Sequence, residues 1–197
     1  EEQGICLDHH TAHLYSTQSD AKQHAVFDGF GSGGWRGRWS GLTRTPEGQQ
    51  RYNNYSIGTY LSYLGEALNF AGSRLDFPGK VMGLQAYGTP DLDLAKQIDD
   101  DSVLELCANW MRRGVDSKDQ KLQDFVATVN KACELIQLDY FKTFDPSYKI
   151  ACSGGVFLNT VINTEIRKHY DLEIPPHVYD GGLSIGALRY AVGYDFE

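Results

Sequence analysis

The sequence predicts an α/β fold, and the clearest observation is the order of segments in its C-terminal third. KIACSGG (149–155) and DLEIPP (171–176) have the short apolar pattern of strands, whereas NTVINTEIRKHY (159–170) and the glycine-opened DGGLSIGALRYAVG (180–193) have helical patterns. Strands that alternate with helices are typical of α/β proteins. The second observation is size: 197 residues, of which 41% are hydrophobic, suffice to bury a core.

The N-terminal part supplies further strands and one short helix. We expect a strand at Gly4–Leu7, a helix from the histidines to about Ser16, and a second strand at Ala25–Phe27 that ends in FDGFGSGG. The segment WRGRWSGLTRTP (35–46) alternates in polarity and contains glycine, which favours a β-hairpin.

The middle of the chain is predicted to be mainly helical. Residues 56–71 place Leu61, Leu64 and Leu68 at helical spacing, and the glycine-containing DFPGKVMGLQAYGTP (76–90) follows as a loop. Residues 91–143 have polar breaks at IDDDS and RGVDSKDQ, and 122–141 form the longest amphipathic helix.

Composition narrows the partners and the compartment. A net charge of −8 argues against binding to duplex nucleic acid, and no apolar run of about eighteen residues is present to span a membrane. The four cysteines lie apart without CxxC spacing, so we expect buried free thiols at Cys6, Cys107, Cys133 and Cys152 and a cytoplasmic protein. The chain opens on Glu1 rather than Met, which suggests a processed N-terminus or part of a longer protein.

The stretch DHHTAH (8–13) is the first candidate for a chemical role. His9 and His13 are four residues apart and share one face of a helix, which suits two imidazole ligands of iron, zinc or manganese. His10 stands where the zinc-protease motif needs glutamate, so that chemistry lacks its general base. Asp28, at a strand end, is a candidate third ligand. A polar helix start without a metal is the alternative.

Three glycine-containing segments are also candidates, each with an ordinary structural alternative. CSGGVFLN (152–159) joins a strand to a helix and can bring backbone amides to an anion or ribose, or be a tight turn. It matches neither the dinucleotide fingerprint nor the P-loop. Asp180 in YDGGLSIGAL either caps a helix or points into a cleft. Lys80 in GKVMGLQAYGTP either contacts a phosphate or is an exposed loop lysine.

The order of these motifs is more specific than any one of them. From Gly4 to about Val192 the chain resembles the O-carbamoyltransferase family of nodulation-factor and antibiotic-tailoring enzymes, which is related to the tRNA threonylcarbamoyladenosine synthase and hydrogenase-maturation carbamoyltransferase domains. The motifs that carry the resemblance are DHHTAH, VFDGFG, SIGTYLSYLGEALNF, GKVMGLQAYGTP, CSGGVFLN and YDGGLSIGAL.

The resemblance implies an actin-like, sugar-kinase-like ATPase fold with two lobes around a central cleft. Residues 1–90 would form a truncated first lobe with the histidine segment, and 91–197 a helical segment and a second α/β lobe with nucleotide-binding turns. It also implies that ATP and carbamoyl phosphate give carbamoyl-adenylate, whose carbamoyl group passes to a hydroxyl of a small molecule or nucleoside.

The resemblance also implies a site. Family members hold a metal, usually iron, with two histidines and two aspartates, here His9, His13, Asp28 and Asp180. His10 would pack, support the ligands or deprotonate the acceptor hydroxyl as a catalytic residue.

The implied nucleotide contacts are Gly154, Gly155 and Asn159, with Lys80 and Met82 lining the same cleft. The family pattern GLAPYG is replaced by GLQAYG, which removes a proline from that loop.

Relatives in this family carry a further initial stretch and a large C-terminal domain that this sequence lacks, so we expect missing segments or a partner chain. A non-catalytic or partner-dependent metal- and nucleotide-binding subunit is the alternative function. An actin-like nucleotide-gated scaffold is a third, which follows from the fold analogy alone.

Overall fold

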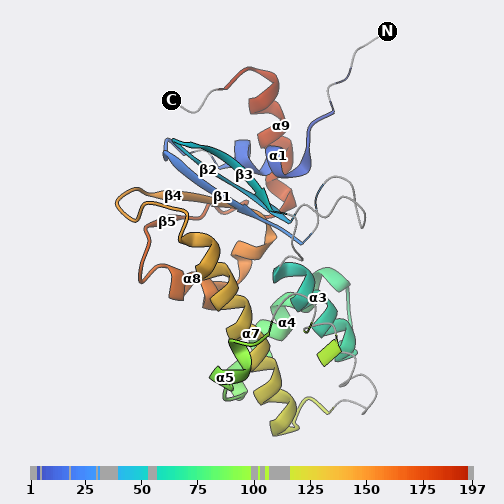
Figure 1. Cartoon of the computed structure of the whole chain (residues 1–197). Helices are drawn as coiled ribbons and strands as arrows, with labels where there is room; N and C mark the ends of the chain where they lie inside the picture. The colour runs from blue at the N-terminus through green and yellow to red at the C-terminus, as the bar shows by residue number, and fades with distance from the viewer. Residues whose placement is uncertain are drawn as a thin grey trace. The chain divides into compact units, whose positions relative to one another are not determined.

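The computed structural model confirms a mixed α/β protein that divides into two compact units, residues 1–56 with 143–197, and residues 57–142 (Figure 1). We call these unit 1 and unit 2. The described residues are 4, 6–17, 19–29, 31, 40–52, 57–98, 102, 105–106 and 116–194.

Unit 1 is built on a five-stranded sheet in the order β3-β2-β1-β4-β5. β1 is parallel to β4 and antiparallel to β2, β3 is antiparallel to β2, and β5 is parallel to β4. β1 and β4 are buried along their whole length, as expected of central strands. The strands are β1 (Gln23–Phe27), β2 (Gly41–Thr45), β3 (Gly48–Tyr52), β4 (Ile150–Ser153) and β5 (Leu172–Glu173).

The helices of unit 1 are α1 (His9–Ser16), α8 (Thr160–Ile166) and α9 (Leu183–Ala191), with 3₁₀ turns η3 (Gly155–Leu158) and η4 (Asp180–Gly182). α1 packs against β1, β4 and α9 (Figure 1). The contact with α9 is close because Gly186 has no side chain: a Cβ there would lie 1.8 Å from the carbonyl oxygen of Ala12. This packing brings the start of α9 beside the histidine helix.

Unit 2 is helical in its described residues, with α3 (Ile57–Ala67), α4 (Phe77–Leu84), α5 (Leu92–Ala95) and α7 (Gln120–Phe141), and 3₁₀ turns η1 (Arg74–Asp76) and η2 (Gln85–Tyr87). α3 packs on α4, and α7 contacts α5 and η2. α7 confirms the predicted longest helix, and α3 confirms the helix predicted over 56–71, although it ends at Ala67. Asn69 adopts a positive φ of 50° just after it, which is a common way for a helix to end.

Four expectations about local structure are wrong. Gly4, Cys6 and Leu7 lie in no strand, and Cys6 is exposed rather than buried. The hairpin consists of β2 and β3 and covers residues 41–52, whereas we expected it at 35–46. Residues 35–39 of the expected hairpin lie outside the described residues. The loop at 76–90 contains α4, because Pro78 falls in the first turn of that helix, where no N–H is needed.

The other cysteine predictions have mixed outcomes. Cys133 and Cys152 are buried free thiols, as expected, and Cys107 lies outside the described residues. Within the described part of the chain, no helix combines the length and apolar character that crossing a bilayer requires. The actin-like fold and the lobe division at residue 90 stay predictions.

Candidate metal centre

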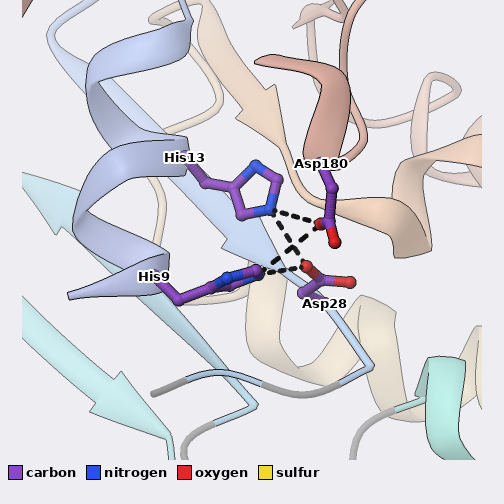
Figure 2. A group of neighbouring side chains, drawn as sticks. All are labelled: His9, His13, Asp28 and Asp180. Atoms are coloured by element: carbon purple, nitrogen blue, oxygen red, sulfur yellow. Dashed lines mark hydrogen bonds and ion pairs between the residues drawn. The ribbon is translucent and has the colours of Figure 1, made fainter. Parts of the chain in front are cut away.

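The two predicted histidine ligands lie on one face of α1. Asp8 begins this helix by accepting a hydrogen bond from the backbone N–H of Thr11 at 3.0 Å, which satisfies a free donor of the first turn. Arg51 of β3 donates to the same Asp8 oxygen at 3.0 Å and so ties the start of α1 to the sheet. His9 is partly exposed, His13 is fully buried, and both Nε2 atoms point to the same place (Figure 2).

Asp28 follows β1 and brings one carboxylate oxygen to both histidines. Its Oδ2 lies 2.9 Å from Nε2 of His9 and 3.0 Å from Nε2 of His13. Its Oδ1 faces the other way and accepts backbone N–H bonds from Gly29 at 2.7 Å and Gly155 at 3.3 Å. The carboxylate is therefore held by one oxygen and presents the other.

Asp180 reaches the same point from the opposite end of the sequence. It opens η4, directly before α9, and its Oδ1 lies 3.3 Å from Nε2 of His13 and 3.6 Å from Nε2 of His9 (Figure 2). Its side chain is 67% exposed, against 13% for Asp28. The alternative in which Asp180 caps the helix is wrong, since the N-cap of η4 is Tyr179 and that of α9 is Gly182.

The four side chains fit a divalent metal ion. Each side chain offers one ligand atom, and these four atoms all lie within 4.8 Å of one another. Neighbouring ligands of a tetrahedral or octahedral ion with bonds near 2.1 Å are separated by about 3.0 to 3.5 Å. The distances between the histidine Nε2 atoms and the carboxylate oxygens, 2.9, 3.0, 3.3 and 3.6 Å, follow that spacing. Two imidazoles and two carboxylates are a donor set that iron, zinc and manganese accept.

The charges in the site are strongly coupled. The hydrogen bond with Asp28 raises the pKa of His9 above its ordinary value, although burial opposes this. Burial alone would raise the pKa of Asp28, but hydrogen bonds from His13 and His9 outweigh it and hold that pKa far below its usual range. Asp28 is therefore a carboxylate at neutral pH, and it favours a cation at this point.

A pair of serine hydroxyls lies behind His13. Ser153, the last residue of β4, places Oγ 3.2 Å from Nδ1 of His13. Ser16, the last residue of α1, places Oγ 3.0 Å from Oγ of Ser153 and donates to the His13 carbonyl oxygen at 2.7 Å. All three side chains are fully buried. We call Ser16 and Ser153 the serine pair.

His10 lies beside the ligands, with its ring centre 5.6 Å from that of His9. Its ring is fully buried, and a Cβ on Gly31 would lie 2.0 Å from its Cε1 atom. Neither ring nitrogen has a hydrogen-bond partner among the described residues, and burial lowers the pKa of His10 to about 4. These contacts support the packing alternative for His10, and its role as a catalytic base stays a prediction.

The predicted nucleotide-binding turn of unit 1 contacts the metal ligands. Gly154 has a φ of 100°, and a Cβ there would lie 2.1 Å from the carbonyl oxygen of Phe27, so the turn packs directly on the end of β1. Gly155 donates its N–H to Asp28. Asn159 begins α8 by accepting from the N–H of Ile162, and its buried amide nitrogen has no partner among the described residues.

Lys80 and Met82 belong to unit 2, on α4. Lys80 is exposed, and its ammonium group donates to the carbonyl oxygen of Ala71 and lies 6.0 Å from the ring centre of Phe77. Lys80 is thus exposed, as the alternative of an exposed loop lysine expected, but it lies in a helix and not in a loop. The part in nucleotide binding of Lys80 and of Met82 stays a prediction.

Sequence reasoning missed the groups that hold the ligands in place. Ser153, Ser16 and Arg51 were not singled out, and Gly155 was assigned to a nucleotide rather than to Asp28. A signal for Ser153 existed, because the ends of neighbouring parallel strands meet at one edge of a sheet, as those of β1 and β4 do here.

A comparison with models of known protein families finds no match for this chain. A comparison with curated proteins finds no match either. The resemblance to carbamoyltransferases therefore depends on the motifs and on the site that their residues form.

Proposed function

We propose that this chain binds a divalent transition metal through His9, His13, Asp28 and Asp180 and is the metal-bearing core of a carbamoyltransferase. The observation that carries the proposal is the convergence of four ligand atoms from three separate parts of the chain, with the spacing of a coordination sphere. The motif order supplies the reaction: ATP, carbamoyl phosphate and water give carbamoyl-adenylate, phosphate and pyrophosphate, and the carbamoyl group then passes to a hydroxyl of a small molecule or nucleoside with release of AMP. Iron is our first choice of metal, with zinc or manganese as alternatives.

When bound, the metal supplies a Lewis acid for phosphoryl or carbamoyl oxygens. The residues of this chain do the rest. His13 and Asp28 are buried or nearly so and form the fixed side of the site, whereas Asp180 and His9 form its accessible side. In a protein with a net charge of −8, a bound cation would also attract an anionic substrate.

We place the ATP beside the turn at Gly154, Gly155 and Asn159. The support is that Gly155 of this turn donates its N–H to Asp28, and that the buried amide nitrogen of Asn159 has no hydrogen-bond partner among the described residues. The acceptor hydroxyl is not assigned to any residue.

A second candidate is a metal-binding, partner-dependent subunit without activity of its own. Two observations favour it: the Gly155 N–H is already used by Asp28, and the Lys80 ammonium by Ala71. Groups that the nucleotide would need are thus engaged within the chain.

Metal analysis and turnover separate the two candidates. The protein is loaded anaerobically with Fe²⁺, and pyrophosphate release from ATP is measured with and without carbamoyl phosphate. Release that requires both the metal and carbamoyl phosphate supports the enzyme. One bound metal per chain without turnover supports the subunit. Absence of metal binding by iron, zinc and manganese would overturn both.

A further inference from the structure

The donors and acceptors in the hydrogen bonds between His13, Ser153 and Ser16 can be assigned, because one of the atoms, the His13 carbonyl oxygen, can only accept. The His13 carbonyl oxygen has no proton, so the Ser16 hydroxyl donates to it, at 2.7 Å. The single proton of Ser16 is then used. Its 3.0 Å contact with Ser153 is a hydrogen bond only if Ser153 is the donor.

The proton of Ser153 is used in the same way. It is donated to Ser16 or, at 3.5 Å, to the carbonyl oxygen of Val178, which also can only accept. With that proton directed away from His13, the 3.2 Å contact between Ser153 and Nδ1 of His13 is a hydrogen bond only if Nδ1 carries a proton. Three of these contacts are satisfied together in one direction, from Nδ1 of His13 to Ser153, from Ser153 to Ser16, and from Ser16 to the His13 carbonyl oxygen; the longer contact of Ser153 with the Val178 carbonyl is then not a hydrogen bond.

In the neutral imidazole the opposite ring nitrogen then bears the lone pair, whereas a proton on it makes His13 an imidazolium that donates to Asp28. Nε2 of His13 faces Oδ2 of Asp28 at 3.0 Å and Oδ1 of Asp180 at 3.3 Å. A nitrogen lone pair and two carboxylate oxygens repel one another unless a cation lies between them, and a metal ion or a proton are the cations that fit. A histidine ligand whose other nitrogen donates to a fixed acceptor is a stronger and better oriented ligand.

We propose that Ser153 and Ser16 are positioning residues that fix the proton of His13 on Nδ1 and thereby direct Nε2 to the metal. The proposal rests on the metal site of the proposed function, but it concerns residues that no motif of the resemblance assigns. Ser153 acts directly on His13, and Ser16 acts through Ser153.

The test compares Ser153→Ala, Ser153→Thr and Ser16→Ala with the control Ser184→Ala, an exposed serine of α9. Zinc affinity is measured by competition with a chelator on the full chain, after thermal unfolding has shown that each variant is folded. We expect Ser153→Ala to weaken zinc binding about 10- to 100-fold, Ser16→Ala to weaken it less, and Ser153→Thr to keep most of it. The control should not change. Equal zinc affinity in wild type and a folded Ser153→Ala would overturn the proposal.

A second readout keeps the two proposals distinguishable. Nitrogen-15 NMR of the imidazole ring reports which nitrogen of His13 carries a proton. We expect a protonated Nδ1 in both the zinc-free and the zinc-loaded wild type, and a bare Nδ1 in either state would overturn the serine-pair proposal. If wild type binds no metal but Nδ1 is protonated, the proposed function fails and the hydrogen-bond assignment stands. If Ser153→Thr does not fold, Ser16→Ala and the NMR readout decide.

Discussion

The two carboxylates of the candidate site come from regions that treat them very differently. At the end of β1, Asp28 is mostly buried and two backbone N–H groups hold its Oδ1. In the turn before α9, Asp180 is two-thirds exposed, and it occupies the N-cap position of neither η4 nor α9. Both nevertheless bring an oxygen to the same two histidine nitrogens.

The difference shows how an acidic site can be fixed on one side and adjustable on the other. Asp28 is set by the fold, so it contributes the same geometry with or without an ion. Asp180 is two-thirds exposed, and its contacts with His9 and His13 are longer than those of Asp28. We therefore expect changes on the Asp28 side to have the larger effects.

Replacing Asp28 should have the largest effect. Asp28→Asn keeps the shape but removes the charge that both histidines face, so we expect metal affinity to fall by more than about 100-fold, beyond the loss typical of supporting groups. Chelator competition measures it. Asp20→Asn, the same change at an exposed residue outside the site, is the control and should bind as wild type does.

Asp180→Asn should reduce metal affinity by only about tenfold, because the exposed carboxylate is the less fixed ligand and water can take its place. The same chelator competition applies. A loss equal to or larger than that of Asp28→Asn would contradict the comparison between the two regions.

The pKa of His9 in the metal-free protein measures how strongly each of the two carboxylates, Asp28 and Asp180, interacts with that histidine. Its pKa lies above 6.5 chiefly because of the hydrogen bond with Asp28, while Asp180 acts only through its charge. We expect the pKa of His9, followed by NMR of the metal-free protein, to fall in Asp28→Asn and to fall less in Asp180→Asn. The reverse order would show that Asp180 is the dominant partner.

The raised pKa of His9 also sets the sign of two pH effects. At a pH below the unfolded-state pKa of His9, the interaction of its protonated ring with Asp28 stabilises the metal-free fold. This stabilisation is lost as the pH rises through the raised pKa of His9 in the folded protein. Metal affinity changes in the opposite sense. It rises over the same interval, because the metal and the proton compete for one nitrogen.

The smallest effect is expected at Gly155. A Cβ there would lie 3.0 Å from Oδ1 of Asp28, a tight contact that displaces the carboxylate by a few tenths of an ångström. We expect Gly155→Ala to lower metal affinity by about threefold, below the usual range for a lost supporting group. Gly83→Ala, at a position with open space around it, is the control. An unchanged affinity in Gly155→Ala would show that Asp28 is less fixed than its hydrogen bonds indicate.

Much of the fold was predictable because its signals are local. The helical spacing of residues 120–141 and the apolar run at 150–153 each identify their own element. The errors occur where tertiary structure decides: α4 forms around Pro78 and two glycines, and Gly4, Cys6 and Leu7 lie in no strand although the sequence 4–7 has the apolar pattern of one.

The candidate site was predictable only in part, for the same reason. The spacing of His9 and His13 is a local signal, and α1 confirms the helix it needs. That Asp28 and Asp180 join them follows from the pairing of β1 with β4 and the packing of α9 on α1, which no local pattern contains. The roles of Ser153 and Gly155 in holding the ligands depend on that same pairing.

The parallel pairing of β1 with β4 also has a consequence for kinetics. It joins Gln23 to Ile150 across the whole of unit 2, so a long loop must close before the two strands meet. The four ligands converge only after that closure and after α9 has docked. A metal ion that needs all four cannot guide the early steps of folding. Metal binding should therefore leave the folding rate nearly unchanged and slow unfolding, so that only the unfolding limb of a chevron plot changes.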